Sequence, residues 1–334
     1  MKAPINMSLQ MIFNALLLFG FVAGAATLHA QPVCTDFAEI ENPPPFDYPR
    51  RERFRLFWNN WLAQDTPFHM GHDLVVAAGN PSRLTGKFDY GIVFHKDLEY
   101  EWVQTYIYGP NLGDWQFIGR HATNSDGKIF VELPALEEGT YVVKMVVMGD
   151  LSSTNAYVRV VSPGTQAVVF DIDETLTIDD LETILDYTGI EWAEPRQGAG
   201  ELVEHYIALG YHPIFLTARP YWYAKGSRQW LRDYMHLPDY TLRTALSNED
   251  SIFRTADYKA GVLQEIQNGG ISIFRAYGNA DTDIEAYERV GIPKNQTFTI
   301  GDLAGDNGTT PIPGGGYNDH LDTVVATTPD SGCR

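Results

Sequence analysis

Two carboxylates stand one residue apart in Asp171-Ile172-Asp173, directly after the apolar residues 167–170. Like charges that are crowded into a partly desolvated crevice repel each other and need a cation nearby. Magnesium prefers hard oxygen ligands of this kind. The alternatives are a calcium loop and an ordinary acidic turn, but a calcium loop favours glycine where this sequence has Leu176. We therefore expect a magnesium site beside residues 171–173.

A hydroxyl group and backbone amides follow the next apolar run. Residues 212–216 lead into Thr217-Ala218-Arg219-Pro220. The Thr217 hydroxyl and the N–H groups of Ala218 and Arg219 could bind the oxygens of a phosphate. A threonine at this place could equally cap the helix that follows. The run is therefore ambiguous between substrate binding and helix capping.

Three further polar groups come later in the chain. Lys259 stands near the start of a predicted helix, where a lone lysine is usually a solvated surface residue. The apolar residues 271–277 end at Gly278, which permits close approach of the backbone. Asn279 and Asp283 follow and supply oxygen ligands. We expect both to face the same crevice as the two carboxylates at 171 and 173.

The elements that must position these groups alternate between strand and helix. The predicted strands are 167–170, 212–216, 241–245, 271–277 and 296–300, and the predicted helices are 198–209, 223–235, 256–267 and 281–290. Such alternation predicts an open parallel sheet with right-handed crossovers, and ligands bind outside the carboxyl ends of its strands. All of the candidate residues are thus expected at one edge of the sheet.

The first half of the chain has a different pattern. Residues 54–162 form short β-rich runs between turn residues, which predicts an antiparallel β-sandwich that loosely resembles immunoglobulin-like modules. Residues 124–127 predict a hairpin turn. His69 and His72 are interpreted as two solvated loop histidines rather than a metal pair. A polar linker (31–53) precedes this domain, and the Ser/Pro/Gly stretch 162–166 ends it.

The order DIDETLT, LTARP, the Lys259 helix and GNADTD resembles the haloacid dehalogenase (HAD) superfamily of phosphotransferases. Residues 166–302 look like the lipin-type phosphatidate phosphatase domain, which also occurs in the Nir/RdgB phosphatidylinositol-transfer proteins. Residues 211–220, 276–293 and 296–301 carry this likeness. It implies a HAD-like Rossmannoid sheet over residues 163–326, followed by a tail at 327–334. Glu174 departs from the lipin pattern, which has glycine there.

The resemblance also implies a mechanism for hydrolysis of a phosphomonoester. Asp171 would attack phosphorus to form an aspartyl-phosphate, and Asp173 would act as general acid and then general base. Thr217 and Lys259 would hold the transferring oxygens. The resemblance implies a magnesium ion held by the Asp171 carboxylate, the Asp173 carbonyl and Asn279, with Asp283 in contact either directly or through another ligand.

The spacing of the motifs bears on the substrate. About forty residues separate Thr177 from Thr217, which is enough for one loop and one crossover helix. Little or no cap is therefore expected, and an open site suits a lipid phosphate such as phosphatidate at a membrane surface. Residues 304–316 could form a rim or a plain connection. The alternative functions are a non-catalytic phospholipid-binding module and an exported acid phosphatase for soluble esters.

Composition and charge limit the classes of molecule that the protein is expected to bind. The 334 residues carry 43 Asp and Glu against 24 Lys and Arg, a net charge of −19. So acidic a chain is not expected to bind nucleic acid without regard to sequence. Tight electrostatic adhesion to anionic lipid is also disfavoured, although a local basic or apolar patch remains compatible with the composition.

The first thirty residues resemble a targeting segment. Lys2 precedes the apolar run 11–22 and the small residues 23–26, which predicts a signal peptide cleaved near Ala25 or Ala30. An uncleaved anchor is the alternative. No later stretch is long enough to span a bilayer, so we expect an exported periplasmic or extracellular protein. In that compartment Cys34 and Cys333 are predicted to form a disulfide, with two unpaired tails as the alternative.

Overall fold

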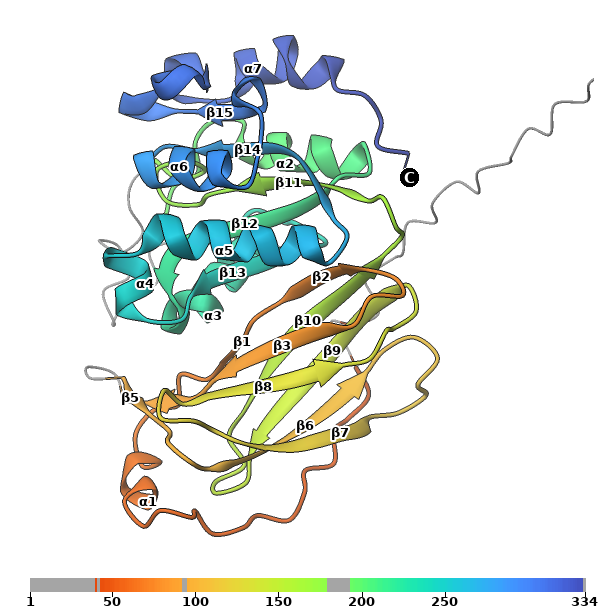
Figure 1. The fold of residues 1–334 in the computed structure, drawn as a ribbon, viewed down its shortest axis with the longest axis vertical. Helices are drawn as coiled ribbons and strands as arrows, with labels where there is room; N and C mark the ends of the chain where they lie inside the picture. The colour runs from red at the N-terminus through yellow and green to blue at the C-terminus, as the bar shows by residue number, and fades with distance from the viewer. Residues whose placement is uncertain (1–39, 41–42, 92–94, 179–192, 333–334) are drawn as a thin grey trace, which may run out of the picture. The chain divides into compact units, whose positions relative to one another are not determined.

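A computed structural model describes residues 40, 43–91, 95–178 and 193–332 (Figure 1). Residues 32–334 form one compact unit. The predicted signal peptide, Cys34, Cys333 and residues 179–192 lie outside the described residues, so the signal peptide, the disulfide and the lack of a cap stay predictions. Within the described ranges, no helix has the length and apolar character needed to cross a membrane.

The first half is a β-sandwich, as predicted, built from a three-stranded and a five-stranded sheet. The first sheet has the order β1 (Met70–Gly71), β3 (Ser82–Lys87), β8 (Lys128–Leu133), and the second has the order β2 (Leu74–Ala77), β10 (Ser153–Val161), β9 (Gly139–Val147), β6 (Trp102–Tyr108), β7 (Gln116–Ala122). A two-stranded pair, β4 (Asp89–Tyr90) and β5 (Lys96–Asp97), and the short helix α1 (Asn59–Leu62) complete it.

The residue pattern explains which strands are central. β9 lies between β10 and β6 and is buried along nearly its whole length. β8, at the edge of the smaller sheet, alternates between buried and exposed or half-buried residues, as expected for a strand with one solvated face. Apolar side chains from both sheets, among them Leu84, Val143 and Val158, form one shared core.

Three details of this half differ from the sequence-based predictions. β2 pairs in parallel with β10, so the sandwich is not wholly antiparallel. The turn at residues 124–127 joins β7 to β8, which belong to different sheets, and it is therefore not a simple hairpin. The interpretation of the two histidines as solvated is also wrong. His72 is buried and its Nε2 lies 2.8 Å from the Thr244 carbonyl, while the half-buried His69 bonds to Ser152.

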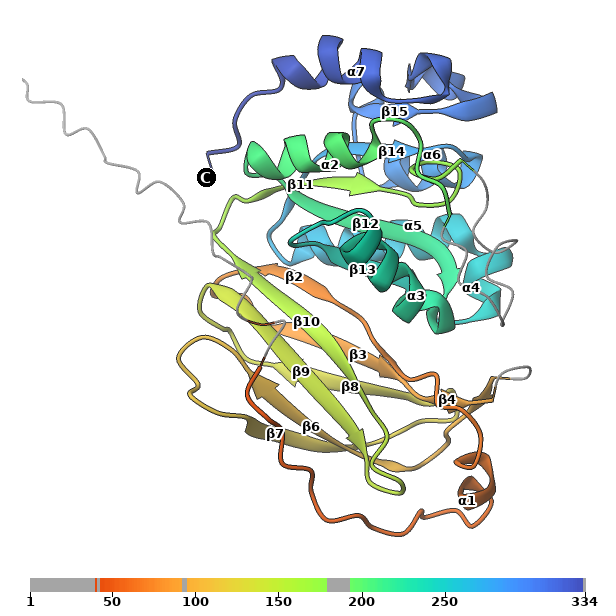
Figure 2. The same ribbon diagram turned by 180° about the vertical axis from the view of Figure 1, so that it is seen from behind.

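The second half has a six-stranded, wholly parallel sheet (Figure 2). Its order is β13 (Thr241–Ala245), β12 (His212–Pro220), β11 (Gln166–Phe170), β14 (Ser272–Gly278), β15 (Thr297–Thr299), β16 (Thr310–Pro311). The helices are α2 (Ala199–Ala208), α3 (Ala224–Gln229), α4 (Asn248–Ile252), α5 (Thr255–Asn268), α6 (Asp281–Arg289) and α7 (Asn318–Thr323). The predicted α/β class is confirmed.

The order of the strands explains where the candidate site lies. β11 stands between β12 and β14, so the chain leaves β11 on one side and later returns on the other. Ligands of open parallel sheets bind at such a switch point, outside the carboxyl ends of the strands. Separate apolar clusters on the two faces of β11, one containing Val168 and Phe170 and the other Ala167 and Val169, fix it in the centre of the sheet.

Two segments of this half differ in detail from their predictions. The predicted helix 223–235 is a 3-10 turn (Tyr221–Tyr223), then α3, then a π-helical turn (Trp230–Tyr234). The loop 304–316 is more than a plain connection, because part of it forms β16 and extends the sheet, and Ile312 is buried in the core.

A buried ion-pair cluster ties the sandwich to the α/β half. Asp73, which is fully buried before β2, accepts hydrogen bonds from Arg228 (2.9 Å) and from the backbone N–H of Leu242 (3.1 Å). Arg159 of β10 bonds to Asp239 at 2.5 Å. Since a buried charge without its partner is strongly unfavourable, these contacts fix α3 and β13 against the sandwich.

Candidate active site

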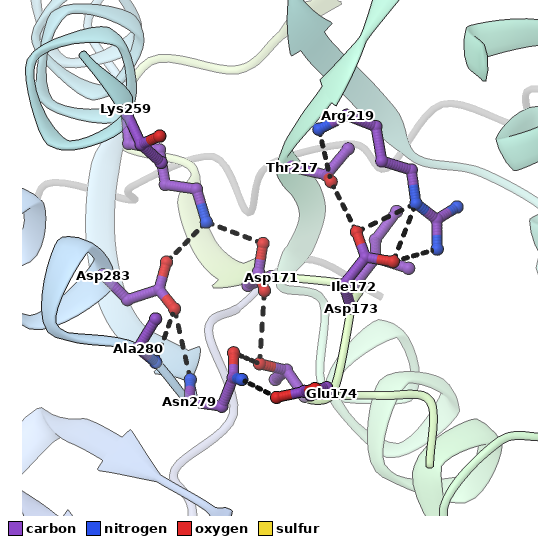
Figure 3. Close-up of polar contacts among 12 residues, drawn as sticks. Asp171, Ile172, Asp173, Glu174, Thr217, Arg219, Lys259, Asn279, Ala280 and Asp283 are labelled. Atoms are coloured by element: carbon purple, nitrogen blue, oxygen red, sulfur yellow. Dashed lines mark hydrogen bonds and ion pairs between the residues drawn. The ribbon is translucent and has the colours of Figure 1, made fainter. Parts of the chain in front are cut away.

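A buried lysine joins two carboxylates at the carboxyl edge of the sheet (Figure 3). The Lys259 ammonium, on the first turns of α5, donates to Asp171 Oδ1 at 2.7 Å and to Asp283 Oδ1 at 2.5 Å. All three side chains are buried. The alternative of a solvated surface lysine is therefore wrong. Lys259 lies with Asp171, as the resemblance implied, and neutralises part of the negative charge of the two carboxylates.

Burial and charge shift the pKa values of this cluster in ways that oppose one another. Burial raises the pKa of Asp171, and the neighbouring carboxylates of Asp283 and Asp173 raise it further, whereas Lys259 opposes them. Burial alone would lower the pKa of Lys259, but the carboxylates of Asp171 and Asp283 outweigh it and hold that pKa above its usual value. The lysine therefore stays protonated, and a second positive charge near Asp171 would favour the carboxylate form.

Asp173 is held by the strand that follows the first crossover. The Thr217 hydroxyl donates to Asp173 Oδ2 at 3.0 Å, and Arg219 Nε lies 2.9 Å from both carboxylate oxygens. Arg219 Nη1 donates to Ser227 Oγ at 2.9 Å, so a residue of α3 holds the guanidinium in this orientation. Because β12 continues through Pro220, Thr217 lies within a strand, and the capping alternative is wrong.

Oxygen atoms from the loops that follow β11 and β14 lie near Asp171. The Thr175 hydroxyl lies 3.0 Å from Asn279 Oδ1 and 3.4 Å from Asp171 Oδ2. The Asn279 amide nitrogen donates to Glu174 Oε2 at 3.1 Å. Among the described residues, no group of three or more His, Cys, Asp or Glu side chains is arranged to hold a metal ion. Asp171 Oδ2 and Asn279 Oδ1 are nevertheless oxygen atoms of the kind that a hard divalent cation prefers, and these two residues could supply part of its ligand set.

Asp283 has a different position from the other acidic residues. Its Oδ1 accepts from Lys259, and its Oδ2 accepts from the backbone N–H groups of Asn279 and Ala280, each at 3.1 Å. Gly278 is required there, since a Cβ atom would lie 2.6 Å from the Asp283 side chain. Both carboxylate oxygens are thus engaged, and Asp283 orients the Asn279 loop and Lys259.

The sequence predicted the members of the cluster but not all of their contacts. Asp171, Asp173, Thr217, Lys259, Asn279 and Asp283 lie together, while Ala218 and Arg219 follow on the same strand. The backbone N–H of Arg219, which was predicted to bind a phosphate oxygen, donates to the Thr217 hydroxyl at 3.1 Å, and the guanidinium of Arg219 holds Asp173. Thr175 and Ser227 were not singled out. The position of Thr175 within DIDETLT could have indicated it, whereas nothing local to Ser227 would have done so.

Both halves of the chain match family models of known proteins. Residues 168–301 match the family model of the LNS2 domain of the PITM 1-3 proteins, and residues 67–160 match the model of their β-sandwich domain. The α/β half is similar to an LNS2 domain. The predicted likeness to the Nir/RdgB proteins is confirmed at this level, and the LNS2-like half contains every candidate site residue.

Two relatives illustrate the likeness. Protein retinal degeneration B of Drosophila melanogaster is 34% identical over 239 residues, which cover 70% of this chain and 18% of that protein. Human membrane-associated phosphatidylinositol transfer protein 1 is 30% identical over 272 residues, covering 79% of this chain and 21% of that protein. The chain thus spans about a fifth of the length of these relatives.

The likeness to one solved structure is slight. A superoxide reductase (neelaredoxin) from Ignicoccus hospitalis aligns with 28% of this chain and 80% of its own chain, at 16% identity and a TM-score of 0.22. A TM-score this low indicates neither a shared fold nor a shared function.

Proposed function

We propose that the LNS2-like half is a HAD-like, magnesium-dependent phosphatase that hydrolyses a phosphomonoester, with a lipid phosphate such as phosphatidate as its substrate. The observation that carries this proposal is the joint presence of Asp171 and Asp173 beside Lys259 and Asn279. Two carboxylates, a buried cation and an amide oxygen at a strand edge are the groups that phosphoryl transfer needs.

Asp171 is the proposed nucleophile. Its Oδ1 is fixed by Lys259, which leaves Oδ2, on the side of Thr175, to attack phosphorus. Attack forms an acyl-phosphate bond and breaks the bond from phosphorus to the ester oxygen. Water then cleaves the aspartyl-phosphate and regenerates the carboxylate. Lys259 stabilises the negative charge that develops on the transferring oxygens.

Asp173 is the proposed general acid and base. It would give a proton to the departing alkoxide and take one from the hydrolytic water. In this structure Thr217 and Arg219 fix the orientation of its carboxylate. Arg219 would have to loosen its hold for Asp173 to carry a proton, because the guanidinium stabilises the carboxylate form.

Magnesium, when bound by Asp171 and Asn279, would neutralise the charge of an approaching phosphate. Glu174 lies close enough to Asn279, at 3.1 Å, to take part through its own carboxylate. The backbone carbonyl of Asp173 is a further proposed ligand. Asp283 is proposed to act indirectly, since its two oxygens already accept hydrogen bonds from Lys259, Asn279 and Ala280.

A second candidate function is a non-catalytic module that binds a phospholipid headgroup. The relatives are named as phosphatidylinositol transfer proteins, and the bidentate contact of Arg219 with Asp173 occupies the carboxylate that catalysis requires. In this alternative Lys259, Thr217 and the neighbouring amides would bind the phosphate without cleaving it.

The two functions are separated by measuring phosphate release and lipid binding on the same protein. The substrates are phosphatidate in mixed micelles, a nucleoside monophosphate and a phosphopeptide, each with Mg²⁺ and with EDTA. The Asp171→Asn variant removes the nucleophile, and Asp302→Asn, an exposed acid in the loop after β15, is the matched control. The proposal expects Mg²⁺-dependent release of phosphate from phosphatidate, lost in Asp171→Asn and kept in the control.

Other results would favour the alternatives. Phosphatidate binding without phosphate release would favour the non-catalytic module. Preference for the soluble esters would favour an exported acid phosphatase. Hydrolysis by Asp171→Asn at the wild-type rate would show that the nucleophile is wrongly assigned.

A further inference from the structure

A short segment before the first sandwich strand combines basic and aromatic residues in an otherwise acidic protein. Residues 50–55 (RRERFR) hold four of the 24 Lys and Arg and a single acid, Glu52. Phe57, Trp58 and Trp61 follow directly, the last within α1. This segment lies outside both stretches that match family models, 67–160 and 168–301. We call residues 50–61 the basic-aromatic segment.

The segment is fixed to the sandwich by two buried side chains. Phe54 belongs to the sandwich core, where a Cβ atom at Gly149 would lie 2.2 Å from its ring. Glu101, only 2% exposed, accepts from the backbone N–H groups of Arg55 (2.8 Å) and Leu56 (2.9 Å) and from the Asn59 amide (2.8 Å). The backbone before and within α1 is therefore held in one conformation.

Held in this way, the segment displays large apolar side chains to solvent. Phe57 is 80% exposed, Trp61 81% and Trp58 50%. Single exposed apolar residues are ordinary, but three aromatic residues within five positions form a patch that marks an interaction site. Because the fixed backbone holds them outside, their exposure does not arise from fraying of a loose end.

The arginines of the segment lie next to this patch. Three of them are exposed: Arg50, Arg51 and Arg53. They line an open groove of about 570 Å³ together with Glu52 and with Asn60, which belongs to α1. Arg55 is also exposed, with its guanidinium over the Trp102 ring and donating to the Tyr100 carbonyl. Glu52, the one acidic residue of the run, forms an ion pair with Arg120 of β7 at 2.7 Å, which offsets its negative charge.

We propose that the basic-aromatic segment docks this protein on an anionic phospholipid bilayer, with Trp58 and Trp61 inserted at the headgroup level and the arginines on the lipid phosphates. Tryptophan favours the membrane interface because its ring is amphipathic, and each basic residue near an anionic surface adds to the attraction. A local patch of this kind lets a chain of net charge −19 approach anionic lipid, because repulsion from distant acids is screened beyond about 10 Å.

The position of the segment is compatible with a membrane-facing active site. In Figure 1, α1 and α4 both lie on the side toward which β11 and β12 run, and the candidate site is at the carboxyl ends of those strands. Ile252 at the end of α4 and the adjoining Phe253 are 66% and 82% exposed. A bilayer on this side would meet apolar side chains from both halves of the chain.

The test uses residues 31–334, since residues 32–334 form a compact unit and the apolar leader would itself bind lipid. Co-flotation is measured with phosphatidylcholine vesicles and with vesicles that also contain about a third phosphatidylserine. The aromatic variant is Trp58→Ala/Trp61→Ala, and the basic variant is Arg50→Gln/Arg53→Gln. The matched controls are Phe117→Ala and Arg83→Gln, which alter exposed side chains of β7 and β3.

Wild-type protein is expected to bind the anionic vesicles and to lose affinity as salt is raised. The basic variant, which lacks two arginines, should bind roughly 25-fold more weakly, at about fivefold per arginine. The aromatic variant should bind at least about tenfold more weakly and should lose the quenching of tryptophan fluorescence by brominated lipid. Both controls should bind like wild type. The vesicles contain phosphodiester lipids and no phosphomonoester, so this test does not depend on the proposed catalysis.

Three results would overturn the proposal. The first is that the wild-type protein binds neither kind of vesicle. The second is wild-type affinity in both the aromatic and the basic variants. The third is binding to a soluble polyanion such as heparin, weakened in the basic variant, with no quenching by brominated lipid, because the partner would then be a charged macromolecule rather than a bilayer.

Discussion

Asp89 provides a test of how firmly the sandwich holds the segment after β12. This residue of β4 is fully buried and accepts a hydrogen bond from the Tyr221 hydroxyl at 2.5 Å, one residue beyond Pro220. His95 Nδ1 lies 3.1 Å from the same oxygen, and Oδ1 has no hydrogen-bond partner among the described residues. Asp89→Asn replaces the carboxyl group with a neutral group of the same shape.

The expected magnitude follows from the pKa. Burial raises the pKa of Asp89 from 3.8 to about 7, against the opposing effects of Tyr221 and Lys87. Between these values the folded protein binds the proton and the unfolded chain does not, so the free energy of unfolding falls as pH rises from about 4 to about 7. A shift of about 3 units corresponds to about 4 kcal/mol. The asparagine of the Asp89→Asn variant does not titrate, so the free energy of unfolding of this variant does not fall in this way as pH rises.

Urea unfolding at a series of pH values measures the effect. The stability of Asp89→Asn relative to wild type should rise by up to about 4 kcal/mol between pH 4 and pH 8. Asp302→Asn, at an exposed site, should show a difference that does not vary with pH. A pH-independent difference for Asp89→Asn would refute the reasoning. Destabilisation that grows toward pH 8 would show instead that Asp89 forms a stabilising ion pair there.

Two further changes probe the candidate site. Lys259→Met leaves Asp171 and Asp283 buried without their counter-charge, so urea unfolding at pH 8 should show a loss of about 3–5 kcal/mol in the free energy of unfolding. The loss should be smaller at pH 5, because burial raises the pKa of Asp171 and lets this carboxyl group take up a proton. Arg219→Lys keeps the positive charge but loses the bidentate contact with Asp173. The kcat for phosphate release should fall by about 100-fold with KM little changed. An unchanged kcat would exclude a positioning role for Arg219.

Local sequence was sufficient to predict the strands that carry the site. The continuous apolar run before Asp171 indicated a strand buried on both faces, and β11 is buried in the centre of a parallel sheet. The alternation of strand and helix then implied that Thr217 and Asn279, which follow β-strand residues, reach the same edge as Asp171. These inferences held because they depend on periodicity and on the fixed direction of parallel strands.

Contacts between distant elements were not accessible in this way. Lys259 and Asp171 are 88 residues apart, and the family resemblance, not the position of Lys259 near a helix start, predicted that the lysine belongs to the site. The burial of His72 depends on the Thr244 carbonyl, 172 residues away in the other half. The parallel pairing of β2 with β10 likewise joins strands separated by most of the sandwich.

The sequence by itself determined the types of reactive group, their order along the chain and the edge of the sheet at which they meet. Only the tertiary structure decided that Lys259 neutralises Asp171 and that Arg219 holds Asp173. It also decided that Phe54 and Glu101 fix a segment whose aromatic side chains stay in solvent. Periodicity reports which face of an element is buried, whereas the partner of a buried charge depends on which other element packs against it.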